Sequence, residues 1–120
     1  MKKSILFIIS ETPYMGIKAA ESIDAALAVA SYGHPVSIWF CAEGVINLLQ
    51  DNDAKTLSYH DHCAALQGLD YFEIENVIVT DLDYNNYQLE KKSLRYQPDI
   101  IQSIKMIEQL ANYQHIFRLS

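Results

Sequence analysis

The chain has 120 residues and a formal net charge of −6, with half of its residues hydrophobic and 20% charged. This length and composition fit one globular domain over residues 1–120 and exclude a disordered or repetitive chain. Between Thr56 and Glu90 there are seven acids and no Lys or Arg. Direct, tight nucleic-acid binding is therefore not expected, because it depends on cations that neutralise phosphates.

The beginning of the chain resembles a signal peptide, since basic residues precede the apolar run Ile5–Ile9. That run is too short for a secretory segment, and Glu11 ends it without a small-residue cleavage site. We predict a buried first strand over Ser4–Ser10. No apolar run is long enough to span a membrane, so we expect a cytoplasmic protein. Cys41 and Cys63 are too few for a disulfide framework and are expected to be free thiols.

The first half of the chain alternates between strand and helix patterns. A loop marked by Pro13 and Gly16 follows the first strand. Apolar residues then recur at helical spacing over Ile17–Tyr32, and Gly33 stands where a helix is expected to end. Further along, we predict a strand over Pro35–Cys41, a short helix over Glu43–Gln50, a turn at Asp51–Asp53 and a helix over Thr56–Leu69.

The second half continues the alternation. The β-branched run Val77–Thr80 predicts a third strand. Residues Leu82–Lys92 form a polar loop with tyrosines and room for a helical turn, and Ser93–Gln97 is predicted as a short strand. Pro98 and Asp99 favour the start of a last helix. Its apolar stripe would comprise Ile100, Ile104, Ile107, Leu110 and Ala111, and a final strand would follow over His115–Leu119.

Alternating strands and helices predict an α/β fold of the Rossmann-like type, with three α/β/α layers and a mostly parallel sheet of about five strands. Such sheets bind ligands beyond the carboxyl ends of their strands. Three segments follow predicted strands there: Ser10-Glu11-Thr12, Cys41-Ala42-Glu43 and Thr80-Asp81-Leu82. None contains a convincing catalytic set.

The loop after the first strand lacks both the glycine-rich dinucleotide motif and the P-loop ending. A helix N-terminus there can bind an anion, but Glu11 opposes it, and we interpret the loop as a structural turn. Binding of a small ligand near Ser10 and Thr12 stays open as an alternative.

Cys41 precedes a predicted helix, where the pKa of a thiol can be lowered. Glu43 opposes that effect and no cation is close in sequence, so Cys41 is interpreted as a small hydrophobic residue. Within His60-Asp61-His62-Cys63, His60 and Cys63 would share a helix face, but zinc needs two further ligands. Asp51–Asp53 lacks the glycine and the glutamate of a calcium loop. We therefore predict no catalytic, cofactor-binding or metal-binding residue.

The chain has eight tyrosines and one tryptophan. Several aromatic residues fall in or near predicted loops, where they favour either a protein interface or a cap on the ends of the core. Both interpretations stay open for Tyr71, Phe72, Tyr84, Tyr87 and Tyr96.

An ordered set of segments carries a family resemblance. The Ala-rich helix is followed by Trp39-Phe40-Cys41-Ala42-Glu43-Gly44-Val45, whose "Phe-x-Ala-Glu-Gly-Val" passage is the most specific piece. Gly68–Phe72 and Leu110–Arg118 extend the match. Together these residues resemble the DsrE/DsrF-like family, and most closely its TusC (DsrF) branch.

The resemblance implies a Rossmann-like subunit that joins TusB-like and TusD-like chains in a hetero-hexamer. Such a complex passes persulfide sulfur, through a TusE-like carrier, toward 2-thiolation of the wobble uridine of tRNA. The resemblance places the sulfur-accepting cysteine in the TusD-like chain, and here Val79-Thr80-Asp81 has no thiol. We expect a non-catalytic subunit. The alternatives are a DsrEFH-like subunit of sulfur oxidation, a sulfur carrier that uses Cys41, and a small-ligand binding module.

Overall fold

The computed structural model describes residues 4–12, 18–49, 74–92, 94 and 96–118. Its centre is a parallel sheet of five strands in the order β4-β3-β2-β1-β5. The strands are β1 (Ile5–Ile9), β2 (Val36–Phe40), β3 (Asn76–Thr80), β4 (Asp99–Ile101) and β5 (His115–Arg118). The predicted fold class and the mostly parallel sheet are thus confirmed.

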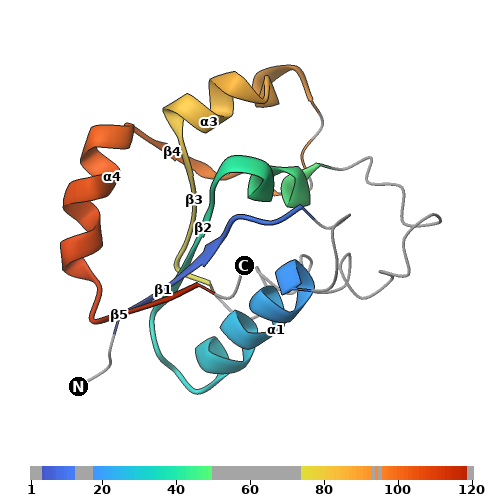
Figure 1. The fold of residues 1–120 in the computed structure, drawn as a ribbon. Helices are drawn as coiled ribbons and strands as arrows, with labels where there is room; N and C mark the ends of the chain where they lie inside the picture. The colour runs from blue at the N-terminus through green and yellow to red at the C-terminus, as the bar shows by residue number, and fades with distance from the viewer. Residues whose placement is uncertain (1–3, 13–17, 50–73, 93, 95, 119–120) are drawn as a thin grey trace.

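Helices cover both faces of this sheet (Figure 1). One face is covered by α1 (Lys18–Ser31), the 3-10 helix η2 (Ala42–Leu48), α3 (Asp81–Asn86) and the 3-10 helix η3 (Leu89–Lys91). The other face is covered by α4 (Ser103–Gln109), which continues into the 3-10 helix η4 (Leu110–Asn112). Within the described residues no helix is long and apolar enough to cross a membrane.

The strands divide their side chains between the two faces because successive residues alternate. In β1, Ile5, Phe7 and Ile9 join the core beneath α1, whereas Leu6 and Ile8 point to the α4 side. Both sets are apolar, which explains why the run Ile5–Ile9 is hydrophobic throughout.

In the first half of the chain, the described elements β1, α1, β2 and η2 lie where strands and helices were predicted, whereas the loop residues Pro13 and Gly16 lie outside the described residues. Helix α1 ends where Gly33 adopts a positive φ of 88° and donates its N–H to the Ala30 carbonyl at 2.9 Å. Glycine occupies this left-handed conformation without the steric cost that a Cβ would bring. The predicted turn at Asp51–Asp53 and helix over Thr56–Leu69 lie outside the described residues.

Two predictions around Pro98 were wrong. The segment after Pro98 is not the start of the last helix, since Asp99–Ile101 forms edge strand β4 and pairs with Ile78–Thr80. The helix begins only at Ser103. Ser93–Gln97 is not a strand in its described residues, where Leu94 makes a single antiparallel bridge to Leu49. The apolar pair Ile100-Ile101 extends along β3 because that edge offers backbone partners, which override the local helix-start signal.

The segment predicted as a polar loop over Leu82–Lys92 is largely helical. It contains α3 and η3, and Leu89 and the rings of Tyr84 and Tyr87 pack against the core beneath α1. The Thr80 hydroxyl accepts a hydrogen bond from the Asp83 N–H at 3.4 Å and caps α3. A cap of this kind satisfies a backbone donor that the first turn of a helix cannot pair.

Candidate functional site

The carboxyl edge of the sheet brings together residues from four strands or their ends. Ser10 follows β1, Cys41 follows β2, Asp83 lies in α3 just after β3, and Arg118 ends β5. The Arg118 guanidinium donates to the Ser10 hydroxyl at 3.1 Å. The Ala42 N–H donates to the Asp83 carboxylate at 3.0 Å. These contacts link positions that are 108 and 41 residues apart in sequence.

Cys41 is the one thiol among the described residues at this edge, and it is half-buried. Burial raises the pKa of the Cys41 thiol above its ordinary value, which the positive charge of Arg118 opposes and the carboxylate of Asp83 reinforces. A thiol with a raised pKa is protonated at neutral pH, whereas sulfur transfer needs the thiolate. The environment of Cys41 therefore disfavours a role as nucleophile.

Asp81, at the end of β3, holds the start of α4 in place. Its carboxylate accepts hydrogen bonds from the Ser103 hydroxyl at 2.9 Å, the Ser103 N–H at 3.0 Å and the Leu82 N–H at 2.8 Å. These bonds, led by the one from the Ser103 hydroxyl, hold the pKa of Asp81 below its ordinary value. A negative charge at the N-terminus of α4 also complements the helix dipole. Asp81 fulfils the role that the sequence assigned to Asp99.

Gly44 and Asn47 join η2 to the end of β1. A Cβ atom on Gly44 would overlap the carbonyl oxygen of Ile9, so only glycine allows this approach of η2 to β1. The fully buried Asn47 amide donates to the carbonyls of Glu11 at 2.9 Å and Gly44 at 2.8 Å. The conspicuous Ala-Glu-Gly-Val passage is thus explained by packing of the backbone.

Comparison with known proteins decides the family. The family model of the DsrE/DsrF-like family matches residues 3–117. The protein belongs to the DsrE/DsrF-like family. A TusC homolog of Aliivibrio fischeri is 24% identical over 92% of this chain and 93% of its own length. TusC of Escherichia fergusonii is 27% identical over 97% of this chain and 98% of its own length.

A solved structure shows the same fold. The crystal structure of the YchN protein from Escherichia coli superimposes with a TM-score of 0.81 and covers 98% of this chain and 99% of that one. The sequence identity is 12%, so this likeness concerns the fold alone. The resemblance inferred from the ordered segments is confirmed by these comparisons.

The other predicted positions of this DsrE/DsrF-like chain are placed as follows. Thr12 is buried, and Ser10 is engaged by Arg118. The described residues contain no cluster of three or more His, Cys, Asp or Glu that could hold a metal ion. His60, His62 and Cys63 lie outside the described residues, as do Tyr71 and Phe72. The half-buried rings of Tyr84, Tyr87 and Tyr96 pack against the main core, which favours their interpretation as caps on it.

The large exposed apolar side chains do not include Tyr84, Tyr87 or Tyr96, which the sequence left open as interface residues. On α4, Ile104 and Ile107, which the sequence placed in the apolar stripe of the last helix, are 69% and 70% exposed. Leu82, Ile100, Ile116 and Phe117 are also at least partly uncovered. Ile104 and Ile107 are three residues apart and share one face of α4. We call this pair the α4 isoleucine face.

Proposed function

We propose that this chain is a non-catalytic subunit of a TusBCD-like sulfurtransferase complex. In that complex it joins TusB-like and TusD-like chains in a hetero-hexamer in the cytoplasm. The complex relays persulfide sulfur, through a TusE-like carrier, toward 2-thiolation of the tRNA wobble uridine. The family and the TusC-named relatives over nearly the whole chain support this placement.

The observation that supports the non-catalytic role most directly is the arrangement of residues at the carboxyl edge of the sheet. Two aspartates follow β3 there. Asp81 accepts a hydrogen bond from Ser103 at the start of α4, and Asp83 accepts one from Ala42 at the start of η2. Cys41, the nearby thiol, has a pKa raised chiefly by burial. An accessible thiolate is the chemical requirement for accepting a sulfane sulfur. In the proposed complex that thiolate belongs to the TusD-like subunit, and this chain supports and shapes the assembly.

The α4 isoleucine face supports the subunit role. Two large aliphatic side chains on one helix face remain mostly in water in the isolated chain. Burial of apolar surface is the main favourable term in association, and exposed apolar patches mark such contacts.

The experiment is a gentle purification of the tagged chain from its own organism, followed by native mass spectrometry. We expect TusB-like and TusD-like chains in equal amounts with it. A Cys41→Ser strain should keep its level of 2-thiouridine in tRNA, and deletion of the whole chain should abolish it. Recovery of the chain alone as a stable monomer would refute the subunit role.

The same strains separate the proposal from its alternatives. If Cys41 carried sulfur, exposure to a persulfide donor would add about 32 Da per sulfur atom to that residue, and Cys41→Ser would lose tRNA thiolation. If the complex served sulfur oxidation instead, deletion would leave 2-thiouridine unchanged and impair growth on reduced sulfur compounds.

A further inference from the structure

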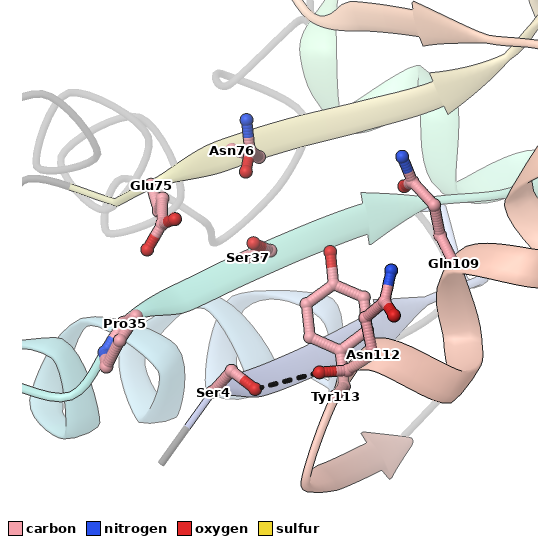
Figure 2. Close-up of a pocket in the computed structure, with 8 residues that line it drawn as sticks. All are labelled: Ser4, Pro35, Ser37, Glu75, Asn76, Gln109, Asn112 and Tyr113. Carbon is pink, nitrogen blue, oxygen red and sulfur yellow. Dashed lines mark hydrogen bonds between the residues drawn. The ribbon is translucent and has the colours of Figure 1, made fainter. Parts of the chain in front are cut away.

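A cavity lies at the amino end of the sheet, opposite the edge that carries Cys41 and Asp81. It has a volume of about 330 Å³ and lies between the beginnings of the strands and the C-terminal end of α4 (Figure 2). Ser37 in β2, Asn76 in β3 and Glu75 just before β3 line one side of it. Gln109, Asn112 and Tyr113 line it from the α4–η4 side. One wall is fixed where the Ser4 hydroxyl donates to the Asn112 carbonyl at 3.1 Å.

Ser37 is the unusual residue in this wall. Its side chain points to the α4 face of β2, where the register of the sheet places it between Leu6 of β1 and Asn76 of β3, and only 4% of the residue is exposed. Figure 2 shows Ser37 between Glu75 on one side and the ring of Tyr113 on the other. Because Ser37 lines the cavity, its hydroxyl can pair with a ligand there.

The charges of the lining select the kind of ligand. Glu75 contributes a carboxylate, and none of the residues that line the cavity is Lys, Arg or His. Ser37, Gln109 and Tyr113 add oxygen atoms that can accept hydrogen bonds. The Asn76 amide N–H group is engaged with Asp99 at 3.1 Å, which leaves its carbonyl oxygen as an acceptor. An anion is therefore disfavoured, and a cation with several donors is favoured.

We propose that this pocket binds an alkylguanidinium group. The planar guanidinium presents five N–H donors, which match a carboxylate together with neighbouring hydroxyl and amide oxygens. The ring of Tyr113 offers an aromatic face that attracts a cation. The volume stands at the lower end of the range for ligand pockets, so it suits one such group with a short alkyl stem. The group belongs either to a free alkylguanidine or to an arginine side chain of another protein.

The test is a titration of the isotope-labelled full chain with agmatine, followed by NMR. We expect saturable shifts of the Ser37, Asn76 and Tyr113 amide signals. A neutral alkylurea of the same shape and inorganic phosphate should shift them far less. A Gly-Arg-Gly peptide separates the two sources, because tighter binding than that of agmatine indicates an arginine side chain of a protein.

Two variants and one control make the result specific. Glu75→Gln, which removes the charge at an exposed position, should weaken agmatine binding about tenfold or more, and Ser37→Ala about threefold to tenfold. Glu108→Gln on the exposed side of α4 should leave affinity unchanged. Circular dichroism confirms that each variant is folded.

The proposal is overturned if agmatine shifts no pocket signal up to about 10 mM. Equal binding of agmatine and alkylurea, or binding that Glu75→Gln leaves unaffected, would overturn it as well. It does not depend on the partner subunits, so failure here leaves the proposed function intact.

Discussion

The two faces of the sheet are built very differently. Beneath α1, η2 and η3, sixteen of the described residues form one buried cluster, which includes Ile38 and Phe40. Beneath α4 the buried cluster comprises Leu6, Ile78 and Met106, with partly exposed neighbours such as Trp39. The first face is closed by the chain's own helices, whereas the second is covered mainly by a helix of seven residues. The difference shows that the chain's own helices bury fewer apolar side chains on the α4 side than on the α1 side.

The largest expected effect compares one isoleucine from each face. Ile38 and Ile78 are both fully buried and lie on paired strands, but they point to opposite sides of the sheet. We expect Ile38→Ala to lower the free energy of unfolding by about 4 kcal/mol and Ile78→Ala by roughly 2–3 kcal/mol, because the thinner layer collapses more easily around a cavity. Urea denaturation of the two variants measures this difference.

The same pair sharpens the comparison inside the assembly. If partner subunits cover the α4 side, the gap between the two variants should shrink in the purified complex, since Ile78 then loses the freedom to relax. Equal costs in the isolated chain would show that the two faces are equally well packed, and the comparison would fail.

A smaller effect concerns the hydrogen bonds between Asp81, which follows β3, and Ser103 at the start of α4. Hydrogen bonds from Ser103 and Leu82 lower the pKa of Asp81 in the folded chain. A carboxyl group with a lowered folded-state pKa stabilises the fold above its unfolded pKa of about 3.9, and this stabilisation is lost as pH falls through the folded value. Wild-type stability should therefore decline below about pH 4 more steeply than that of Asp81→Asn.

Ser103→Ala is a second variant for this pH series. It removes the hydrogen bond that contributes most to the lowered pKa of Asp81. Its stability should therefore decline less steeply below about pH 4 than that of the wild type, although more steeply than that of Asp81→Asn. The exposed Glu108→Gln provides the matched control and should follow the wild type. Identical acid-unfolding curves for Asp81→Asn and the wild type would contradict the role assigned to Asp81.

The fold was largely predictable because its strongest signals are local. The strands Ile5–Ile9 and Val36–Phe40 lie within the predicted runs, since apolar β-branched and aromatic residues mark buried strands. Strand β4 was missed because Pro98, Asp99 and the spacing of Ile100 and Ile104 satisfy a helix pattern equally well. Only the free edge of β3 decides between the two, and that edge is a tertiary feature.

The site was predictable only in part for a related reason. Strand ends were correctly expected to meet, but which ends are neighbours depends on strand order. Arg118 reaches Ser10 because β5 pairs with β1, and Asp83 reaches Ala42 because β3 pairs with β2. No spacing in the sequence reveals these two contacts. The raised pKa of Cys41 follows from the burial and the two charges that this arrangement creates.

A double variant of the α4 isoleucine face should have the smallest effect on stability and the clearest effect on assembly. Ile104 and Ile107 are mostly exposed, so Ile104→Lys together with Ile107→Lys should change the free energy of unfolding by less than about 0.5 kcal/mol per site. If the α4 isoleucine face contacts a partner subunit, the same double variant should lose the TusB-like and TusD-like chains on purification, because two charges would have to be desolvated in an apolar contact.

Tyr32→Lys is the matched control for this loss. Tyr32 is 84% exposed and lies next to the end of α1, on the side of the sheet opposite α4. The Tyr32→Lys variant replaces a large exposed side chain with a positively charged lysine, and we expect this variant to retain the partner chains. If the double variant keeps its partner chains, the contact lies on another surface. If only Tyr32→Lys loses them, the contact lies on the α1 side of the sheet. Either result would reverse the inference that the thinner α4 layer is completed by another chain.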